Sequence, residues 1–481
     1  MNQFQLFRSI VAVSCAVMAA SSLLYCQANS FDRSFHAKTM RVDYFHTGTK
    51  GVETMSLDRV YEEGPWPGST INLLDGLNLG EYLVRVYDEA TTALIFSRGY
   101  STMFNEWQTT DEALAGVYRT FHETVRFPYP KRKVQLTISR RDKKMIFHEI
   151  FSQMIDPNSP TEVNREKRGS ASRAVSLMNN GPSAEKVDIL IVGDGYRKED
   201  MEKFRRDAKH FSDVMFSTSP FKEHKSKFNV WTIEVASLDS GIDKPDKNTW
   251  KATVLGTKYN TFGSARYVLT EENRILHDIA AAAPYDFINI LLNDNRYGGG
   301  GIYNLYTTCY TITDAPGKDW QMDYVYVHEF GHSFGGLGDE YYNSQVSYNE
   351  FYQKGVEPWE PNITALVDKS NLKWKNFVEK DTPIPTQWEK AQFDSLGRER
   401  GKLDRLAADY YRKREPLYLA ERQILGTTKY AGKVGAFEGA GYVSEGLYRP
   451  AADCRMFSLA LVGFDPVCTA ALNRVIDFYS H

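Results

Sequence analysis

Two histidines stand four residues apart with a glutamate between them, in the segment His328-Glu329-Phe330-Gly331-His332. On a helix, residues four apart lie on one face, so both imidazoles can bind the same metal ion. Neutral imidazole is a good zinc ligand, and zinc lowers the pKa of a bound water from about 16 to about 7. The spacing therefore predicts a hydrolytic zinc site with His328 and His332 as ligands and Glu329 as the general base.

The residues around the histidines predict that this segment is helical. Apolar residues recur at helical spacing, and glycines cluster where the helix must end. A chain of this histidine content contains the same five-residue pattern by chance in roughly one case in a hundred. This low frequency and the predicted helix together favour a metal site over a chance occurrence. The predicted apolar face consists of Tyr324, Val325, Val327, Phe330, Phe334 and Leu337.

Two histidines leave a catalytic zinc ion one protein ligand short, and the acid pair Asp339-Glu340 follows the glycines. In the long metzincin pattern a glycine falls seven residues after the first histidine, as Gly335 does, and the third ligand falls three residues later. That position holds Gly338, which cannot ligate. We predict Asp339 as the third ligand, with Glu340 as the competing one. A third interpretation is that both acids only cap the next segment.

Further segments accompany the zinc motif: NDNRYGGGGIYN before it, HEFGHSFGGLGDEYY across it, and EPWEPNIT, GAFEGAGY, GLYRP and DCRM after it. From about residue 189 to the C-terminus the chain thus resembles the bacterial immunoglobulin A metallopeptidase family. The resemblance implies a metzincin-like zinc endopeptidase domain that uses His328, His332 and Asp339 as ligands and Glu329 as base. It also implies that Met456 lies in the turn beneath the metal, although by itself Met456 is as well explained as ordinary core.

The N-terminus predicts export. Arg8 precedes an apolar run over residues 10–24 that is short for a membrane span, which indicates a signal peptide over residues 1–28 of a protein exported from a bacterial cell. Cleavage before Cys26, with a lipid attached to that cysteine, is the alternative, although Tyr25 is larger than the residue usual at that position. The mature protein is then periplasmic, secreted or lipid-anchored, and a lipid anchor is the only membrane attachment we expect.

Composition limits the partners. Lys and Arg number 58 against 61 Asp and Glu, and a net charge of -3 provides no electrostatic footprint for nucleic acid. We therefore expect a protein or peptide substrate and no nucleic acid.

The cysteines leave two interpretations open. Past residue 28 they are Cys309, Cys454 and Cys468. An oxidising compartment allows a Cys454–Cys468 disulfide, and buried free thiols are the alternative. A second zinc site is not predicted from these thiols, because CxxC spacing is missing.

Two domains are predicted. Short β-rich runs at 41–45, 82–87, 93–96, 134–138 and 144–147 indicate a small all-β sandwich over residues 31–160, and a Pro- and charge-rich linker follows. Strands at 189–192, 228–235 and 287–292 alternate with helices at 198–216 and 271–283, which gives an α/β zincin catalytic domain, metzincin-like, over residues 174–481. We expect the sandwich to pack against the catalytic domain, with glycan or substrate binding as the alternative.

Three shorter segments also carry structural or functional predictions. The glycine-rich segment 293–301 is either an edge strand that pairs with an extended peptide or a surface loop, and the resemblance favours the strand. Asp465-Pro466 is predicted to open a C-terminal docking helix. Tyr448 is a speculative donor to the oxyanion, and a packed aromatic is the simpler interpretation.

The predicted function is an exported zinc-dependent endopeptidase in which Glu329 removes a proton from zinc-bound water. A non-catalytic surface-binding protein with structural zinc, or a zinc hydrolase of cell-wall or glycan substrates, are the alternatives. The intact Glu329 argues against the binding protein, because a structural zinc site needs no base.

Overall fold

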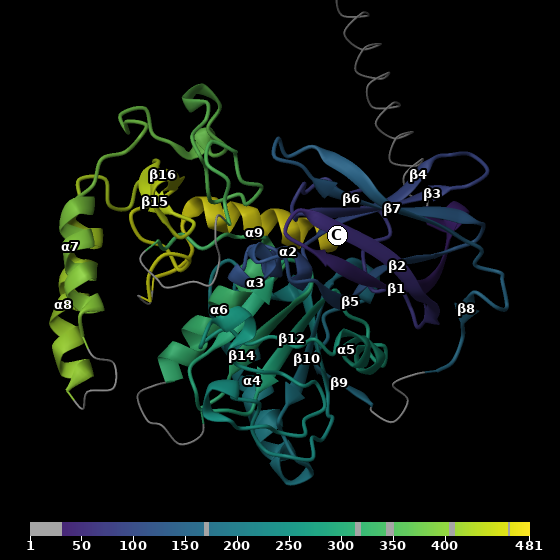
Figure 1. Ribbon diagram of the computed structural model, residues 1–481. Helices are drawn as coiled ribbons and strands as arrows, with labels where there is room; N and C mark the ends of the chain where they lie inside the picture. Colours follow the sequence, from purple (N-terminus) through teal and green to yellow (C-terminus); the bar gives the residue numbers. More distant parts are fainter. Residues whose placement is uncertain (1–30, 168–172, 313–318, 343–350, 404–408, 460–461) are drawn as a thin grey trace, which may run out of the picture.

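The computed structural model describes residues 31–481 except 168–172, 313–318, 343–350, 404–408 and 460–461. The predicted signal peptide, with Cys26, lies outside the described residues. Among the described helices, none has the length and apolar character that crossing a membrane requires. A strand-rich N-terminal region lies beside a mixed α/β region, and helices α7 (Lys390–Gly401) and α8 (Tyr410–Thr427) pair on the far side of the molecule (Figure 1).

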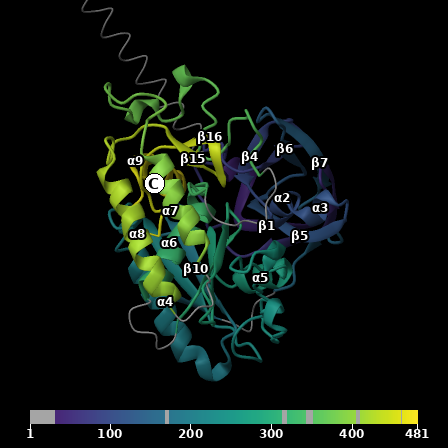
Figure 2. The ribbon, with the colours of Figure 1, turned by 60° about the vertical axis from the view of Figure 1, so that its left-hand side comes forward.

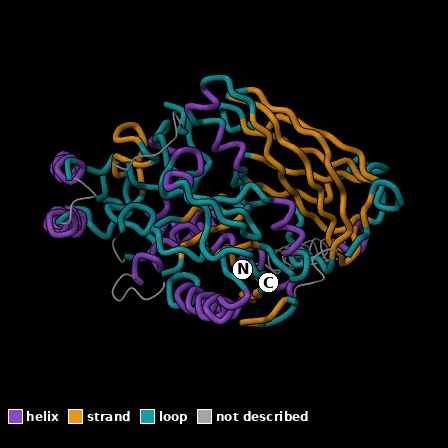
Figure 3. The backbone as a smooth tube through the Cα atoms, turned by 60° about the horizontal axis from the view of Figure 1, so that its bottom comes forward, coloured by secondary structure: helices purple, strands orange, loops and turns teal. Residues whose placement is uncertain are grey.

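Two four-stranded sheets form most of the N-terminal region (Figure 3). Burial alternates along the strands, as in Tyr82, Val84 and Val86, because successive side chains point to opposite faces of a sheet. The buried faces of both sheets share one apolar core. The first sheet has the order β5 (Arg119–Pro130), β1 (Phe35–Thr49), β2 (Val52–Glu63), β8 (Val163–Asn164), and the second the order β4 (Leu94–Tyr100), β3 (Tyr82–Asp88), β6 (Val134–Arg141), β7 (Phe147–Ile155).

This region departs from the prediction in several places, and β2 and β5 were not predicted at all. The predicted strand 144–147 is mostly a turn, because Asp142 accepts the Ile146 N–H and Met145 has φ +62°, so β7 begins only at Phe147. Two short helices, α2 (Met103–Trp107) and α3 (Asp111–Leu114), were not expected in an all-β domain. Both are capped by threonine side chains, and helices of five and four residues carry no periodic signal.

A six-stranded sheet organises the second region. Its central strands are parallel and buried on both faces, which explains their continuous apolar sequence. The predicted strands 189–192, 228–235 and 287–292 correspond to β10, β11 and β12. The sheet order is β13 (Gly299–Ile302), β14 (Tyr306–Tyr310), β12 (Phe287–Leu292), β10 (Val187–Asp194), β11 (Phe228–Ile233), β9 (Ala174–Met178).

Helices cover both faces of this sheet. One face packs against α4 (Met201–Met215), α6 (Asp319–Gly335) and α9 (Pro466–Tyr479), and the other against α5 (Asn273–Ala280). Helices α4 and α5 correspond to the predicted helices 198–216 and 271–283. As predicted, α9 opens at Asp465-Pro466: the Asp465 carboxylate accepts the N–H groups of Val467 and Cys468, and the helix buries its apolar face. Residues 387–423 are rich in charges of both signs, and the described ones include α7 and part of α8.

Side chains of the N-terminal region are buried in the two apolar cores of the α/β region. Phe104 and Trp107 of α2 lie in the core beneath α5, and Leu77 and Leu79 lie in the core of the opposite face. The guanidinium of Arg41 in β1 is 1% exposed and donates to Asp278 of α5 over 2.8 Å. The N-terminal region therefore supports the α/β region through buried contacts. Helix α5 lies next to β5 of the N-terminal region (Figure 2).

Candidate active site

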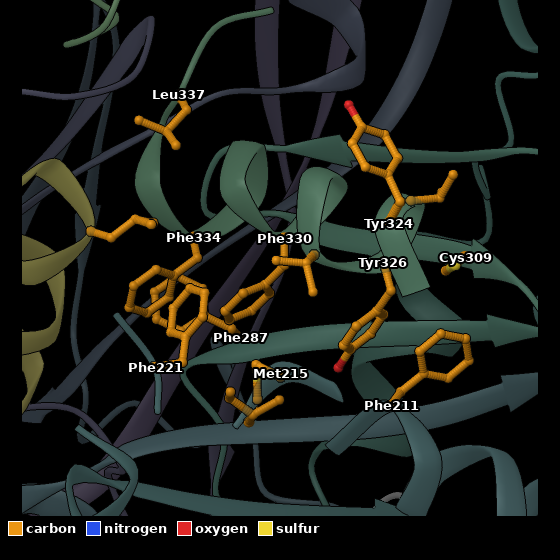
Figure 4. Close-up of a cluster of buried hydrophobic side chains, with 14 of the residues drawn as sticks. Phe211, Met215, Phe221, Phe287, Cys309, Tyr324, Tyr326, Phe330, Phe334 and Leu337 are labelled. Atoms are coloured by element: carbon orange, nitrogen blue, oxygen red, sulfur yellow. The ribbon is translucent and has the colours of Figure 1, made fainter. Parts of the chain in front are cut away.

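Helix α6 carries the two histidines on the side away from the sheet. Phe330 and Phe334 point down onto the strands, where they meet Phe287, whereas Tyr324 points the opposite way (Figure 4). The helix ends at Gly336, whose φ of +60° suits glycine, and the chain then turns back over the helix end.

Three ligand atoms converge above α6. The Nε2 atoms of His328 and His332 are 3.2 Å apart, and Oδ1 of Asp339 lies 3.0 Å from the first and 3.2 Å from the second. Tetrahedral coordination at about 2.0 Å separates ligand atoms by about 3.3 Å. The three side chains thus have the spacing that one metal ion requires.

Backbone carbonyls fix both imidazoles. Nδ1 of His328 donates to the carbonyl of Arg455 over 3.1 Å, and Nδ1 of His332 donates to the carbonyl of Leu337 over 2.6 Å. With these protons on Nδ1, both Nε2 atoms present lone pairs, as does the buried Oδ1 of Asp339, which has no hydrogen-bond partner. Three lone pairs that face one buried point repel one another unless a cation lies between them, so the residues fit a metal ion.

The charges agree with a cation at this point. Burial alone would lower the pKa of His332, but the Asp339 carboxylate raises it to about 9. Burial would raise the pKa of Asp339, but His332 and His328 hold it well below its usual range. The site thus attracts one positive charge, which a proton or a metal ion can supply.

Glu329 lies beside these atoms and stays partly exposed. Its carboxylate is within 4.8 Å of the ligand nitrogens of both histidines, and burial raises its pKa while the two imidazoles oppose that rise. Strand β13 approaches so closely that a Cβ on Gly301 would stand 2.1 Å from the carbonyl oxygen of Glu329. Only glycine fits there, which accounts for part of the glycine-rich segment.

Asp339 and Glu340 point apart. The amide of Asn362 bonds Gly338 through both its oxygen and its nitrogen, and it also donates to Oε1 of Glu340 over 2.9 Å. Burial and the nearby Asp465 raise the pKa of Glu340 well above its usual range. Of the two acids, Asp339 is therefore the one that faces the two histidines, and Glu340 faces a separate buried cluster.

Three more polar side chains lie at the site: Tyr341 from the same turn as Asp339, and Arg266 and Tyr442 from distant segments. The hydroxyl of Tyr442 donates to Oδ2 of Asp339 over 2.6 Å, and the hydroxyl of Tyr341 accepts from Arg266 over 3.2 Å at the mouth of the site. None of these three side chains was predicted from the sequence to lie at the site. The signals available were the position of Tyr341 two residues after Asp339 and that of Tyr442 at the end of GAFEGAGY.

Met456 and Tyr448, the two other residues for which the sequence suggested a role at the site, lie in different places. Met456 is fully buried, and its Sδ lies 3.1 Å from where a Cβ on Gly331 would stand, directly beneath the histidine-bearing turn. Tyr448 belongs to β16 (Val443–Arg449), is paired with β15 (Phe437–Ala440), and is not among the residues that line the cleft. Tyr448 is therefore a partly exposed side chain outside the cleft, and we look to other residues for the oxyanion donor.

A cleft of about 1890 Å³ opens over the site. Pockets for small ligands usually hold about 300–1,000 Å³, so the size suits a longer molecule. The N-terminal region contributes Glu81, Gln108 and Arg140 to the wall, and the α/β region contributes Arg266 and Tyr341. This region thus borders the cleft as well as supporting the sheet.

A helix with two histidines and a glutamate, completed by a carboxylate from the following turn, defines the arrangement of a metal-dependent hydrolase. A family model described as IgA Peptidase M64 matches residues 175–476, and one described as Peptidase M64 N-terminus matches residues 30–152. The chain belongs to the IgA peptidase M64 family and is a metallopeptidase, which confirms the resemblance. A search of curated proteins finds no match.

Proposed function

We propose that the protein is an exported zinc-dependent endopeptidase. The observation that carries the proposal is the convergence of His328, His332 and Asp339, with lone pairs about 3 Å apart, beside the carboxylate of Glu329. Two imidazoles and one carboxylate form the donor set of many catalytic zinc sites, in which a fourth position stays open. A metzincin-like fold for the α/β region, with a β-sandwich in front of it, is supported by Met456 beneath the histidines and by the two sheets around one core.

The residues of the chain divide the reaction between them. A bound zinc ion supplies Lewis acidity, which lowers the pKa of water and polarises a carbonyl. Glu329 accepts the proton of the attacking water and passes it to the leaving amine. Burial raises its pKa above that of an ordinary glutamate, which makes it a stronger proton acceptor.

Arg266 is the residue best placed to stabilise the oxyanion. Its guanidinium interacts electrostatically with Tyr341, Asp339 and Glu329, so it stands close to the reacting atoms. Together with the Tyr341 hydroxyl it presents donors toward the cleft, where a fixed positive charge stabilises developing negative charge.

Strand β13 is the proposed substrate edge, but a short one. Gly299 already bonds Arg266 and Val268 through its backbone, and the Tyr303 carbonyl accepts the Ser101 N–H. Alternation along the strand leaves the N–H and C=O of Gly301, which lies between them, pointing the same way into the cleft. A peptide can therefore add to the sheet over a narrow window next to Glu329.

Glu329→Gln tests the mechanism. The variant should bind zinc as the wild type does and lose at least about 100-fold in kcat/KM on a peptide library, because the base is lost and the ligands are kept. Asp323→Asn, in the same helix but ion-paired with His210, is the matched control and should retain activity. A Glu329→Gln variant that binds zinc and cleaves at the wild-type rate refutes the assignment.

Export is proposed from residues 1–28 and is tested separately. Cell fractionation of the producing bacterium should place the processed chain outside the cytoplasm. If Cys26 carries a lipid, Cys26→Ser should move the protein from the membrane fraction to the soluble envelope fraction. A full-length chain that remains in the cytoplasm refutes export without touching the peptidase assignment.

A further inference from the structure

A second set of ligand-type side chains lies behind the candidate active site. Glu340, Cys454, Asp465 and Cys468 each place one ligand atom within 4.8 Å of those of the other three. All four are buried, with exposed fractions of 0%, 0%, 6% and 0% in that order. They come from three segments of the chain: the end of the histidine turn, the Met456 turn and the first turn of α9.

The distances fit a tetrahedral ion. The two sulfur atoms are 3.8 Å apart, and Sγ of Cys468 lies 3.3 Å from Oε1 of Glu340. Zinc–sulfur bonds of 2.3 Å at the tetrahedral angle place two sulfurs about 3.8 Å apart, and a sulfur and an oxygen about 3.5 Å apart. A disulfide would bring the sulfurs to about 2.05 Å, and the structure has both cysteines as free thiols.

Unsatisfied oxygens point to a missing partner. Oε2 of Glu340 and Oδ2 of Asp465 are buried and have no hydrogen-bond partner, although each belongs to a group that strongly prefers one. The other oxygen of Asp465 caps α9 by accepting the N–H groups of Val467 and Cys468. A cation bound through Oε1 of Glu340 would bring positive charge beside Oε2 of the same carboxylate and would take Oδ2 of Asp465 as a ligand, whereas a disulfide would leave both carboxylates as they are.

Burial raises the pKa of both thiols, so thiolates here need the charge of a bound cation, and two contacts would assist it. Cys468 stands in the first turn of α9, where the helix dipole stabilises negative charge, and Sγ of Cys454 accepts the backbone N–H of Asp465 over 3.4 Å. The fully buried Arg449 interacts electrostatically with Glu340, so it compensates part of the negative charge. Two sulfur and two oxygen donors in tetrahedral spacing are typical of zinc and unsuited to magnesium or calcium.

We propose that Glu340, Cys454, Asp465 and Cys468 bind a second zinc ion, with a structural role. The four protein ligands close the coordination sphere, as in structural zinc sites, and leave no position for water. The ion would tie together the segments that build the active site. Glu340 follows the ligand Asp339, and its N–H donates to the carbonyl of Met456 over 2.9 Å. The carbonyl of Arg455, next to Cys454, holds His328.

Zinc stoichiometry tests the proposal independently of peptidase activity. The protein purified under reducing conditions should contain two zinc ions per chain by elemental analysis. The double variant His328→Ala/His332→Ala should keep one, and Cys454→Ser/Cys468→Ser should lose the other together with thermal stability. Cys309→Ser is the control, because this buried thiol lies outside the cluster, and it should keep both ions.

Two further measurements guard against a misfolded cysteine variant. Glu340→Gln keeps the size of the side chain and should weaken zinc binding at the second site at least about 10-fold, while Asp339 still binds at the first. Cobalt(II) bound to the His328→Ala/His332→Ala variant should show thiolate-to-cobalt charge-transfer absorption. One zinc per wild-type chain, a Cys454–Cys468 disulfide in the exported protein found by alkylation and mass spectrometry, or cobalt without that absorption would each overturn the second site. None of these results bears on Glu329.

Discussion

Gly301→Ala should damage the active site without changing any residue that performs chemistry. The new Cβ would stand 2.1 Å from the Glu329 carbonyl oxygen and 3.2 Å from Cβ of His332. The first contact is more than 1 Å too short, and because the opposing atom is backbone no side-chain rotation relieves it. Strand β13 must therefore lift from α6, or α6 must move.

The structure sets the size of this effect. Overpacking a buried site usually costs about 1–3 kcal/mol, and a clash with backbone belongs at the upper end of that range. A displacement of about 1 Å at the base can cost about 100-fold in rate. We therefore expect Gly301→Ala to lose about 3 kcal/mol of unfolding free energy in urea and about 100-fold in kcat/KM at a temperature where it stays folded.

Gly426→Ala is the matched control for this experiment. Gly426 lies in α8, and a Cβ there meets no atom within 4 Å. Alanine also has the higher helix propensity, so this variant should be neutral or more stable by up to about 1 kcal/mol and fully active. If Gly301→Ala unfolds at the wild-type urea concentration and keeps wild-type kcat/KM, the close packing of β13 on the catalytic helix is refuted.

Two other substitutions follow from the contacts. Tyr442→Phe removes the hydrogen bond to Oδ2 of Asp339 and should weaken zinc binding about 10- to 100-fold with the fold intact, whereas Tyr448→Phe should leave zinc titrations unchanged. Arg41→Met removes a 1% exposed guanidinium that donates two hydrogen bonds to the Asp43 carboxylate. Urea titration should show an unfolding free energy lower by about 3–5 kcal/mol, because the buried Asp43 loses its partner. A loss below about 1 kcal/mol would contradict the buried pairing.

The parts of the fold that the sequence predicts are those with a local signal. The buried strand at 287–292 has the predicted bounds because a continuous apolar run marks a strand buried on both faces. The His328 and His332 pair needed only the period of a helix. By contrast, the helices at 103–107 and 111–114 are too short for any periodicity, and their caps are single threonines.

The remaining site residues could not be predicted because tertiary contacts bring them in. Tyr442 lies 103 positions from Asp339, and no local pattern connects a tyrosine to a distant carboxylate. The second cluster illustrates the same limit. Cys454 and Cys468 are 14 positions apart, without CxxC spacing, and Glu340 lies 128 positions from Cys468. Spacing rules detect ligands that share one turn or knuckle, and they miss a site assembled at the junction of three segments.

The motifs that carried the family resemblance meet around one short segment, residues 338–342. EPWEPNIT supplies Asn362, whose amide holds Gly338 and Glu340, and GAFEGAGY supplies Gly441, whose N–H donates to the carbonyl of Asp339. DCRM supplies the carbonyl that accepts the Glu340 N–H.

The helix sets the spacing of His328 and His332, and one backbone carbonyl fixes each imidazole, whereas Asp339 on the following turn is held by contacts from several distant segments. Because adjacent side chains along this extended segment point to opposite sides, Asp339 faces the two histidines and Glu340 faces the cluster behind them. The C-terminal hundred or so residues thus fix the position of Asp339 through the Gly441 N–H, which donates to its carbonyl, and the Tyr442 hydroxyl, which donates to its carboxylate.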